Sequence, residues 1–368
     1  MFRSLYVHVP FCSGGKCDYC AFASQGHSSP EEQGEYLDAL EEEFRRKKAE
    51  CMPLRSIFIG GGTPSALTAE NLQRLLEMVR RYFRLETDCE WSSEANPESL
   101  TPEKTEVLQE GGVNRLSMGV QSFQEALRRK IGRRGTLANL PEIVSRWRRH
   151  PGNRLNLDLI YAIPGEALEE WKADLEMAMA FQPDHLSCYS LILEEGTPLA
   201  KRLPPADDDD ELFLECWKWN DEFLGRHGLR RYEISNFCRP GCECRHNYEV
   251  WHGQTYLGCG PAAVSFDGQF RFANPSALSE WLRGVPPEVD ELAMEARRRE
   301  VLAFGMRTVD GWKWTDLQNV TNFQKVEVQQ LPASRELYRD GLVKWDAEGL
   351  RPTPKGLLYN DQILEAYL

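Results

Sequence analysis

The stretch YVHVPFCSGGKCDYC, residues 6–20, indicates more about this chain than any other segment of its sequence. It places Cys12, Cys17 and Cys20 within nine residues, in the spacing C-x4-C-x2-C, directly after the apolar run Leu5–Val9. Three thiolates can ligate three irons of a cubane cluster and leave the fourth iron open, whereas four thiolates would complete a cluster for electron transfer. The triad therefore predicts a cluster whose free iron holds a small molecule.

Other uses of these thiols follow from the same spacing. The segment is too compact for a disulfide framework, and a zinc site would need a fourth ligand nearby. His8 could supply that ligand, so zinc remains an alternative for this segment. Gly14 and Gly15 accept positive φ without steric conflict, so we expect a bulged loop between Cys12 and Cys17.

Composition and charge restrict the class of protein. With 368 residues the chain is long enough for one large domain and a smaller one. The net charge of −13 argues against a nucleic-acid partner, which would require a basic face. No run of 18 apolar residues predicts a membrane span, and the start of the chain lacks a charged-then-apolar signal region. The eleven cysteines then indicate reduced thiols available for metal, so we expect a cytoplasmic protein.

Short apolar runs alternate with longer amphipathic stretches over the first half of the chain. We expect strands at Leu5–Val9, Ser56–Gly60, Glu90–Glu94, Arg115–Gly119, Asn156–Ile160 and His185–Ile192. The helices expected between them are Glu31–Lys48, Ala69–Phe83, Pro102–Glu110, Leu137–Arg149 and Glu166–Phe181. Six βα repeats predict a parallel sheet with helices outside it. They are too few for an eight-stranded barrel, and the periodicity alone fits a doubly wound sheet equally well.

Unusual residues gather where the expected strands end. The cysteine loop follows the first strand, and the next three strands end in GGGTPS (60–65), EANP (94–97) and GVQSF (119–123). The fifth strand carries Asp158. Because βα barrels hold their chemistry at the carboxyl ends of their strands, this repeated placement predicts one site there.

The alternation stops after Leu193. We expect the acidic run 204–210 to be a solvated turn at the start of a helix, Glu211–Leu224, where negative charge is favourable. A strand-rich segment, Arg231–Phe272, comes next. The end of the chain is predicted to hold a helix at Ala296–Gly305, a hairpin of Gly341–Lys344 with Leu350–Thr353, and a last helix.

The opening motif resembles that of the radical SAM superfamily, in the branch of the oxygen-independent coproporphyrinogen III oxidases and the HemW haem chaperones. Its pattern Tyr-x-His-x-Pro-Phe-Cys is matched here by residues 6–12, although the usual cysteine spacing in that branch is C-x3-C-x2-C. The resemblance spans nearly the whole chain. It implies an α/β fold: a partial (β/α)6 barrel over residues 1–200, a strand-rich extension over 201–290 and a small winged-helix-like C-terminal domain over 291–368.

The resemblance also implies a set of ligands. Cys12, Cys17 and Cys20 would hold a [4Fe–4S] cluster, and S-adenosylmethionine would bind beside it. Gly61, Gly62 and Thr63 would receive the cofactor's amino group. The other positions implied to contact the cofactor are Tyr6, Tyr19, Glu94, Gln121, Arg133, Asp158 and Ile192. Taken alone, Glu94 could be a surface acid, and Arg133 belongs to a basic stretch that is typical of a solvated face.

A second dense segment precedes Trp251. The haem chaperones carry His-Asn-x-x-Tyr-Trp there; this chain has His246 and Asn247, while Val250 replaces the tyrosine. Neutral imidazole is a common axial ligand of haem iron, so His246 is the candidate haem ligand. The neighbouring thiols could bind zinc or a second cluster with it, although we favour small buried or edge residues for them: Cys238, Cys242 and Cys244.

Three functions compete on these observations. The oxidase branch carries a further cysteine two residues after the third ligand and a substantial N-terminal extension. Position 22 is Phe22, and eleven residues precede Cys12. We therefore favour a HemW-like chaperone that binds haem and passes it to an acceptor, such as a membrane-associated haem protein. The oxidase is the alternative, and a zinc-binding scaffold is a weaker one. Enzymatic activity and a homodimer are left open.

Overall fold

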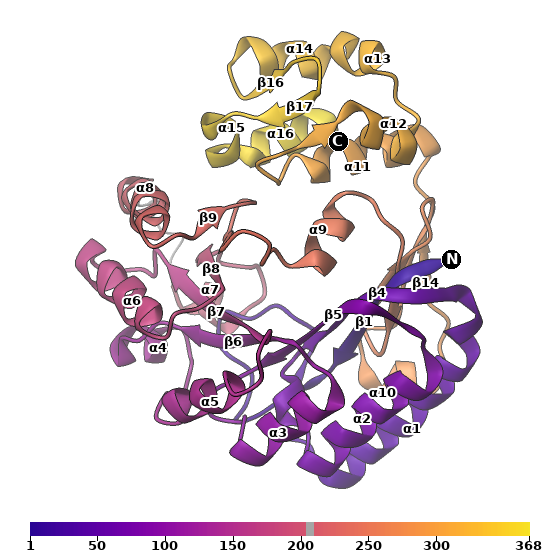
Figure 1. Cartoon of the computed structure of the whole chain (residues 1–368), viewed down its shortest axis with the longest axis vertical. Helices are drawn as coiled ribbons and strands as arrows, with labels where there is room; N and C mark the ends of the chain where they lie inside the picture. Colours follow the sequence, from indigo (N-terminus) through magenta and orange to yellow (C-terminus); the bar gives the residue numbers. More distant parts are fainter. Residues whose placement is uncertain (204–209) are drawn as a thin grey trace.

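The computed structural model describes residues 1–203 and 210–368. Most of the acidic run predicted to be a solvated turn, residues 204–209, lies outside the described residues. One sheet of twelve strands organises the described part of the chain, in the order β14-β13-β12-β11-β1-β4-β5-β6-β7-β8-β10-β9. Its two edges, β14 and β9, do not pair with each other, so the barrel is partial and open (Figure 1).

Six parallel strands form the centre of this sheet, as the sequence predicted. They are β1 (Phe2–Val9), β4 (Cys51–Gly61), β5 (Leu85–Ala95), β6 (Arg115–Gln121), β7 (Arg154–Tyr161) and β8 (His185–Ser190). The helices on its outer side are α1 (Pro30–Lys47), α2 (Ala69–Tyr82), α3 (Pro102–Gly111), α4 (Glu125–Lys130), α5 (Leu140–Trp147) and α6 (Leu168–Ala180) (Figure 1). The α/β fold class is therefore confirmed.

Several expected boundaries are wrong by a few residues; β4 and β5 each begin five residues before the expected Ser56 and Glu90. The last strand of the barrel, β8, ends at Ser190 and not at Ile192, because its partner β7 ends at Tyr161, which pairs with Ser190. The helix expected from Leu137 begins at Leu140, next to a proline that is well suited to the first turn.

The segment after the barrel extends the same sheet at both edges. On one side β11 (Tyr256–Cys259) pairs with β1 in parallel, and antiparallel strands follow it: β12 (Val264–Phe266), β13 (Arg271–Ala273) and β14 (Glu288–Asp290). On the other side β10 (Asn236–Cys238) pairs antiparallel with β8 and with β9 (Arg230–Arg231). The segment predicted to be strand-rich also contains a helix that was not expected, α9 (Arg245–Trp251).

Shorter elements complete this part of the chain. The cysteine loop begins in β2 (Phe11–Cys12), which pairs with β3 (Gln25–Gly26). Two short 3₁₀ helices are also present: η1 (Lys48–Glu50) follows α1, and η2 (Pro64–Ala66) follows β4. The remaining helices are α7 (Pro198–Arg202), α8 (Asp210–Arg226) and α10 (Leu278–Leu282). Helix α8 confirms the helix expected after the acidic run.

The chain from Met294 onward forms a lobe beyond α9 (Figure 1). Its helices are α11 (Met294–Gly305), α12 (Trp314–Thr321), α13 (Lys325–Gln330), α14 (Pro332–Arg339), α15 (Pro354–Leu358) and α16 (Asn360–Tyr367). A small antiparallel sheet orders β15 (Trp312–Lys313), β17 (Gly349–Pro352) and β16 (Val343–Trp345). The apolar core of the lobe is distinct from the main core and also takes in Phe266 of β12, and the predicted hairpin and helices are present. The exact division into three domains stays a prediction.

The two faces of the central strands differ in chemistry. In β6 the side chains of Leu116, Met118 and Val120 are fully buried in the main apolar core. Because side chains alternate along a strand, the residues between them face the barrel interior. These are Arg115, Ser117 and Gly119, and they line an internal cavity. The same alternation gives the barrel an apolar outer face under the helices and a polar inner face.

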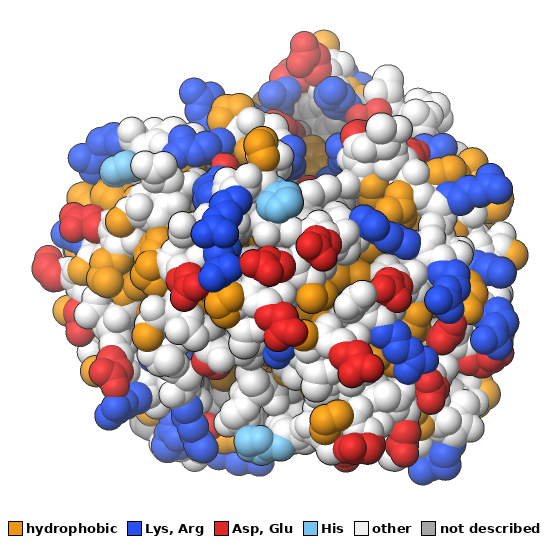
Figure 2. All heavy atoms as spheres, turned by 60° about the horizontal axis from the view of Figure 1, so that its bottom comes forward, with side chains coloured by type: hydrophobic (Ala, Val, Ile, Leu, Met, Phe, Trp, Pro, Cys, Tyr) orange, Lys and Arg blue, Asp and Glu red, His pale blue; other side chains and the backbone are white. Residues whose placement is uncertain are grey.

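The surface is mixed in charge. Figure 2 shows acidic and basic side chains interspersed on the side that carries α1, α2 and α3. Among the described helices, none combines the length and apolarity that crossing a bilayer requires.

Candidate functional site

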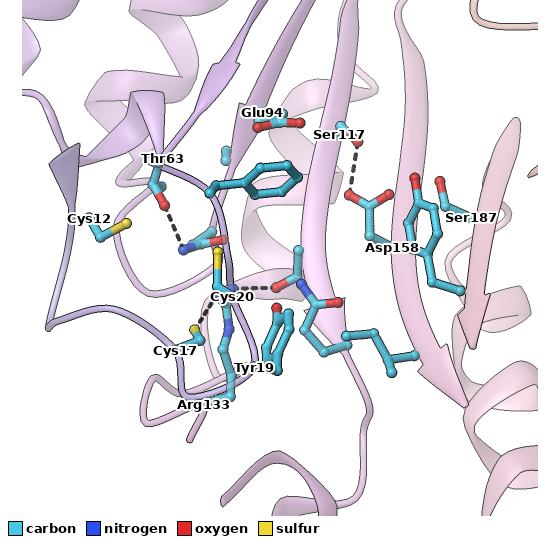
Figure 3. Close-up of a pocket in the computed structure, with 18 of the residues that line it drawn as sticks. Cys12, Cys17, Tyr19, Cys20, Thr63, Glu94, Ser117, Arg133, Asp158 and Ser187 are labelled. Atoms are coloured by element: carbon cyan, nitrogen blue, oxygen red, sulfur yellow. Dashed lines mark hydrogen bonds between the residues drawn. The ribbon is translucent and has the colours of Figure 1, made fainter. Parts of the chain in front are cut away.

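A cavity of roughly 730 Å³ opens at the carboxyl ends of the central strands (Figure 3). The strand-end motifs and the cysteine loop all border this one cavity. Twelve of the predicted site residues line it: Cys12, Cys17, Tyr19, Cys20, Gly61, Gly62, Thr63, Glu94, Gln121, Arg133, Asp158 and Ile192. Tyr6 and His246 do not.

The cysteine loop takes the bulged form expected from its glycines. Gly14 and Gly15 have φ of +73° and +99°, which residues with a Cβ rarely adopt. The extra residue of the C-x4-C spacing is therefore absorbed without strain. Cys12, Cys17 and Cys20 are half-buried at the cavity, and the Cys20 amide donates to the Cys17 carbonyl at 3.2 Å.

His8 is not available as a zinc ligand in this conformation. Its Nδ1 lies 3.0 Å from the hydroxyl of Tyr6 and its Nε2 lies 2.8 Å from the carbonyl of Ala23. Burial lowers the pKa of His8, so the ring is neutral, accepting from Tyr6 and donating to the carbonyl. Across residues 1–203 and 210–368, no three His, Cys, Asp or Glu side chains converge on one metal position. A cubane cluster differs, because each thiolate ligates its own iron.

Neighbouring atoms leave no room for a side chain in the glycine run, residues 60–62. A Cβ on Gly61, whose φ is +106°, would lie 2.6 Å from the ring of His8, and one on Gly62 would lie 2.5 Å from the Phe11 carbonyl. A Cβ on Gly60 would lie 2.9 Å from a carboxylate oxygen of Glu94. These close approaches require a tight turn without side chains, and the turn also leaves bare backbone facing the cavity.

Two carboxyl groups face each other across the cavity interior. Glu94 Oε2 accepts from the Gly61 amide at 3.2 Å. Burial, together with the nearby charge of Asp158, raises the pKa of Glu94 to about 8, so this carboxyl is largely protonated at neutral pH. Burial also raises the pKa of Asp158, against hydrogen bonds that include the Ser117 hydroxyl at 2.9 Å and the Asn156 amide at 2.8 Å. A cationic ligand that pairs with Glu94 would therefore have to displace the proton of this carboxyl group.

Arg133 is not part of a solvated face, unlike its neighbours Arg129 and Arg134, which are exposed. Its guanidinium is buried and donates to the Cys17 sulfur at 3.5 Å and to the Gly119 carbonyl at 2.5 Å. The arginine therefore joins the cysteine loop to the end of β6.

The remaining cavity residues differ in exposure. Gln121 is buried and holds φ of +70°, an uncommon value outside glycine. Tyr19 is half-buried against an apolar cluster beneath the cysteine loop. Ile192 is 66% exposed and lies at the cavity mouth. Its side chain is free to contact a bound ligand.

His246 occupies a position that the haem-ligand prediction did not anticipate. It is the second residue of α9, its side chain is 5% exposed, and its Nδ1 lies 3.2 Å from the Ser56 hydroxyl. The ring stacks obliquely on Phe58 and Tyr6, with ring centroids 5.5 and 6.5 Å apart, and burial lowers its pKa to about 4. The imidazole is neutral, as a haem ligand must be. However, haem iron could reach it only after α9 moves.

The nearby cysteines agree with the favoured interpretation of small buried residues. Cys238 and Cys244 are buried and Cys242 is half-buried. The Cys244 thiol donates to Glu90 Oε1 at 3.8 Å, and the His246 amide donates to the same oxygen at 3.2 Å. These contacts connect α9 to the first half of β5.

Sequence reasoning missed the polar inner face of the barrel. Asn156 lies at its centre, because its Nδ2 donates to Ser117 and its Oδ1 accepts from His185 Nδ1 at 2.7 Å. Burial and the charge of Arg115 keep the pKa of His185 well below its usual value. The signal was present in the sequence: polar residues recur at every second position of three apolar strands, including Asn156 and Asp158.

Comparison with known proteins places this fold and its three-cysteine loop in a class. The family model described as "Radical SAM superfamily" matches residues 6–178. The solved coproporphyrinogen III oxidase (HemN) from Escherichia coli superimposes with a TM-score of 0.86, covering 99% of this chain and 89% of that one at 24% identity. That likeness establishes the fold.

Curated relatives narrow the class. A protein named heme chaperone HemW from Lactococcus lactis is 33% identical over 100% of this chain and 97% of its own length. The protein of the same name from Bacillus subtilis is 34% identical over 84% of each chain, and that from Escherichia coli is 35% identical over 71% of this chain and 69% of its own. The chain therefore belongs to the HemW family of the radical SAM superfamily.

Proposed function

We propose that this protein is a haem chaperone that carries a [4Fe–4S] cluster, binds S-adenosylmethionine at that cluster and passes haem to an acceptor protein. The relatives that match it from end to end are named for that function, and this agreement carries the proposal. Phe22 stands where the oxidase branch has its further cysteine, which also favours the chaperone. The acceptor is proposed to be a haem protein, such as a membrane-associated one, reached from the cytoplasm.

The residues around the cavity fit the two cofactors. Cys12, Cys17 and Cys20 would hold the cluster, which supplies an open iron to the cofactor. The bare backbone at Gly61 and Gly62 allows close approach of a ligand. The buried carboxyls deeper in the cavity would accept hydrogen bonds from its ammonium or ribose.

We also propose roles for three further residues that the sequence indicated as cofactor or haem contacts. The Thr63 hydroxyl accepts a hydrogen bond from the side-chain amide of Asn96 at 3.0 Å, so Thr63 would present its backbone to the cofactor. Tyr6 would act through His8, which it hydrogen-bonds, and not by direct contact. His246 would ligate haem only in a conformation with α9 displaced.

Coproporphyrinogen oxidation is the second candidate, and the fold shared with HemN is the observation that favours it. The two functions are separated by one experiment with two arms on the anaerobically reconstituted protein. Absorbance titration with haemin should saturate near one haem per chain. Incubation with coproporphyrinogen III, S-adenosylmethionine and a reductant should yield no protoporphyrinogen. Saturable turnover in the second arm would assign the oxidase function, and no haem binding in the first would contradict the chaperone.

A further inference from the structure

Arg115 is a buried cation at the end of the cavity that lies toward the amino ends of the barrel strands, and its side chain has no hydrogen-bond or ion-pair partner among the described residues. The side chain of Arg115 on β6 is 3% exposed and lines the cavity. Its Nε is buried with no hydrogen-bond partner, and no hydrogen bond or ion pair joins its guanidinium to another side chain within residues 1–203 and 210–368. An arginine in a protein is always charged, and an isolated buried charge is unfavourable. The arrangement therefore provides an unused set of donors.

Arg115 lies deeper in the barrel than the strand ends where S-adenosylmethionine is proposed to bind, although Glu94 pairs with Ser117, only two residues further along β6. Arg115 precedes Gly119 by four residues on the same strand, which at about 3.3 Å per residue places it roughly 13 Å deeper in the barrel. The residues that line the same end are Asn156, His185, Asn236 and Asn247. Helix α9 closes this end, because it contributes Asn247 to the lining and the amide of His246, its second residue, donates to Glu90.

The charges around this end favour one class of ligand. A guanidinium presents a planar fork of donors that matches a carboxylate. Although burial opposes it, acidic groups near Arg115, which include Glu90 and Asp158, raise its pKa, so the guanidinium stays charged and acidic side chains already lie near it. A doubly charged phosphate would be repelled more strongly than a singly charged carboxylate. The neutral His185 and the amide side chains add polarity without further charge.

We propose that Arg115 forms a carboxylate subsite at the closed end of the cavity, which receives a propionate arm of a tetrapyrrole. The identity of the ligand, haem, rests on the proposed function; the carboxylate subsite rests on Arg115 alone. Haem would then enter the barrel from the open end with one propionate leading. The HemW family's His-Asn segment would form the closed end of its site.

The test compares haemin with its dimethyl ester, in which both propionates are uncharged. The full-length reconstituted protein is titrated with each compound, as wild type, R115Q and R115K. The control is R339Q on α14, whose side chain is 71% exposed. Loss of a charged hydrogen bond should weaken haemin binding by R115Q about 10- to 150-fold. Ester binding should not change, R115K should weaken haemin binding less, and R339Q should match wild type.

A structural role for Arg115 is distinguished by thermal unfolding of the ligand-free protein. Removing an unpaired buried charge should not lower the melting temperature of R115Q, whereas removing a needed counter-ion of Glu90 would lower it. Equal haemin affinity in wild type and R115Q, or an equal loss for haemin and its ester, would overturn the subsite. The subsite would also be overturned if R115Q melted at a lower temperature while R115K preferred haemin over its dimethyl ester as strongly as wild type does.

Failure of the proposed function gives a different result. If wild type binds no haemin, the chaperone proposal fails, and sodium propionate then probes the subsite directly. Propionate should raise the melting temperature of wild type above that in sodium chloride at equal ionic strength, and it should not do so in R115Q. No shift in wild type, or the same shift in both proteins, would overturn the subsite as well.

Discussion

Replacing Glu94 by glutamine should abolish most of the pH dependence of S-adenosylmethionine binding between pH 6 and pH 7. In the ligand-free protein the pKa of Glu94 is about 8, so about a tenth of the carboxyl is ionised at pH 7 and about a hundredth at pH 6. A ligand cation that pairs with the ionised carboxyl must first displace the proton. The sign follows from linkage: affinity rises with pH until the pKa of the free protein is passed. The expected gain is about ninefold from pH 6 to pH 7.

Isothermal titration of the cluster-loaded protein at the two pH values measures this change. Repeating it in two buffers of different ionisation enthalpy should show close to one proton released per cofactor in wild type at pH 7, and close to none in Glu94→Gln. The glutamine variant keeps the shape of the side chain and its oxygen near the Gly61 amide. A wild-type affinity that is flat between pH 6 and pH 7, or an equal slope in the variant, would refute the role given to Glu94.

Three further outcomes are expected. Replacing any one cysteine of the triad by alanine should remove most iron and acid-labile sulfide after anaerobic reconstitution, and a triple variant with a full cluster would contradict the assignment. Gly61→Ala should lower the unfolding free energy in urea by about 1–3 kcal/mol, because its φ is positive and the new Cβ meets the His8 ring; an unchanged midpoint would disprove this. His246→Ala should lower it by a similar amount, about 1–3 kcal/mol, because the ring packs on Phe58; full stability with lost haem binding would instead indicate a dedicated ligand.

The order of the βα units and the edge that carries the site could be predicted from the sequence, because both depend on local patterns. Alternation of apolar strands and amphipathic helices defines the units, and a loop after a parallel strand has only one end of the sheet available to it. Gly14 and Gly15 similarly predict a bulge from their own conformational freedom. The motifs at Gly61, Glu94 and Gln121 could therefore be assigned to one cavity before any coordinates were known.

Long-range packing decided the rest. Whether His8 is a ligand depends on Ala23, fifteen residues away, as well as on nearby Tyr6. Whether His246 is accessible depends on where α9 packs, and its ring contacts Ser56, 190 residues away. The strands after residue 230 join the two edges of the barrel sheet, and at one edge Tyr256 pairs with Ser4, near the start of the chain. Arg115 shows the difference most clearly. Strand alternation indicates which face it is on, but only the folded barrel surrounds it and leaves its guanidinium without a partner, because burial is a property of the whole chain.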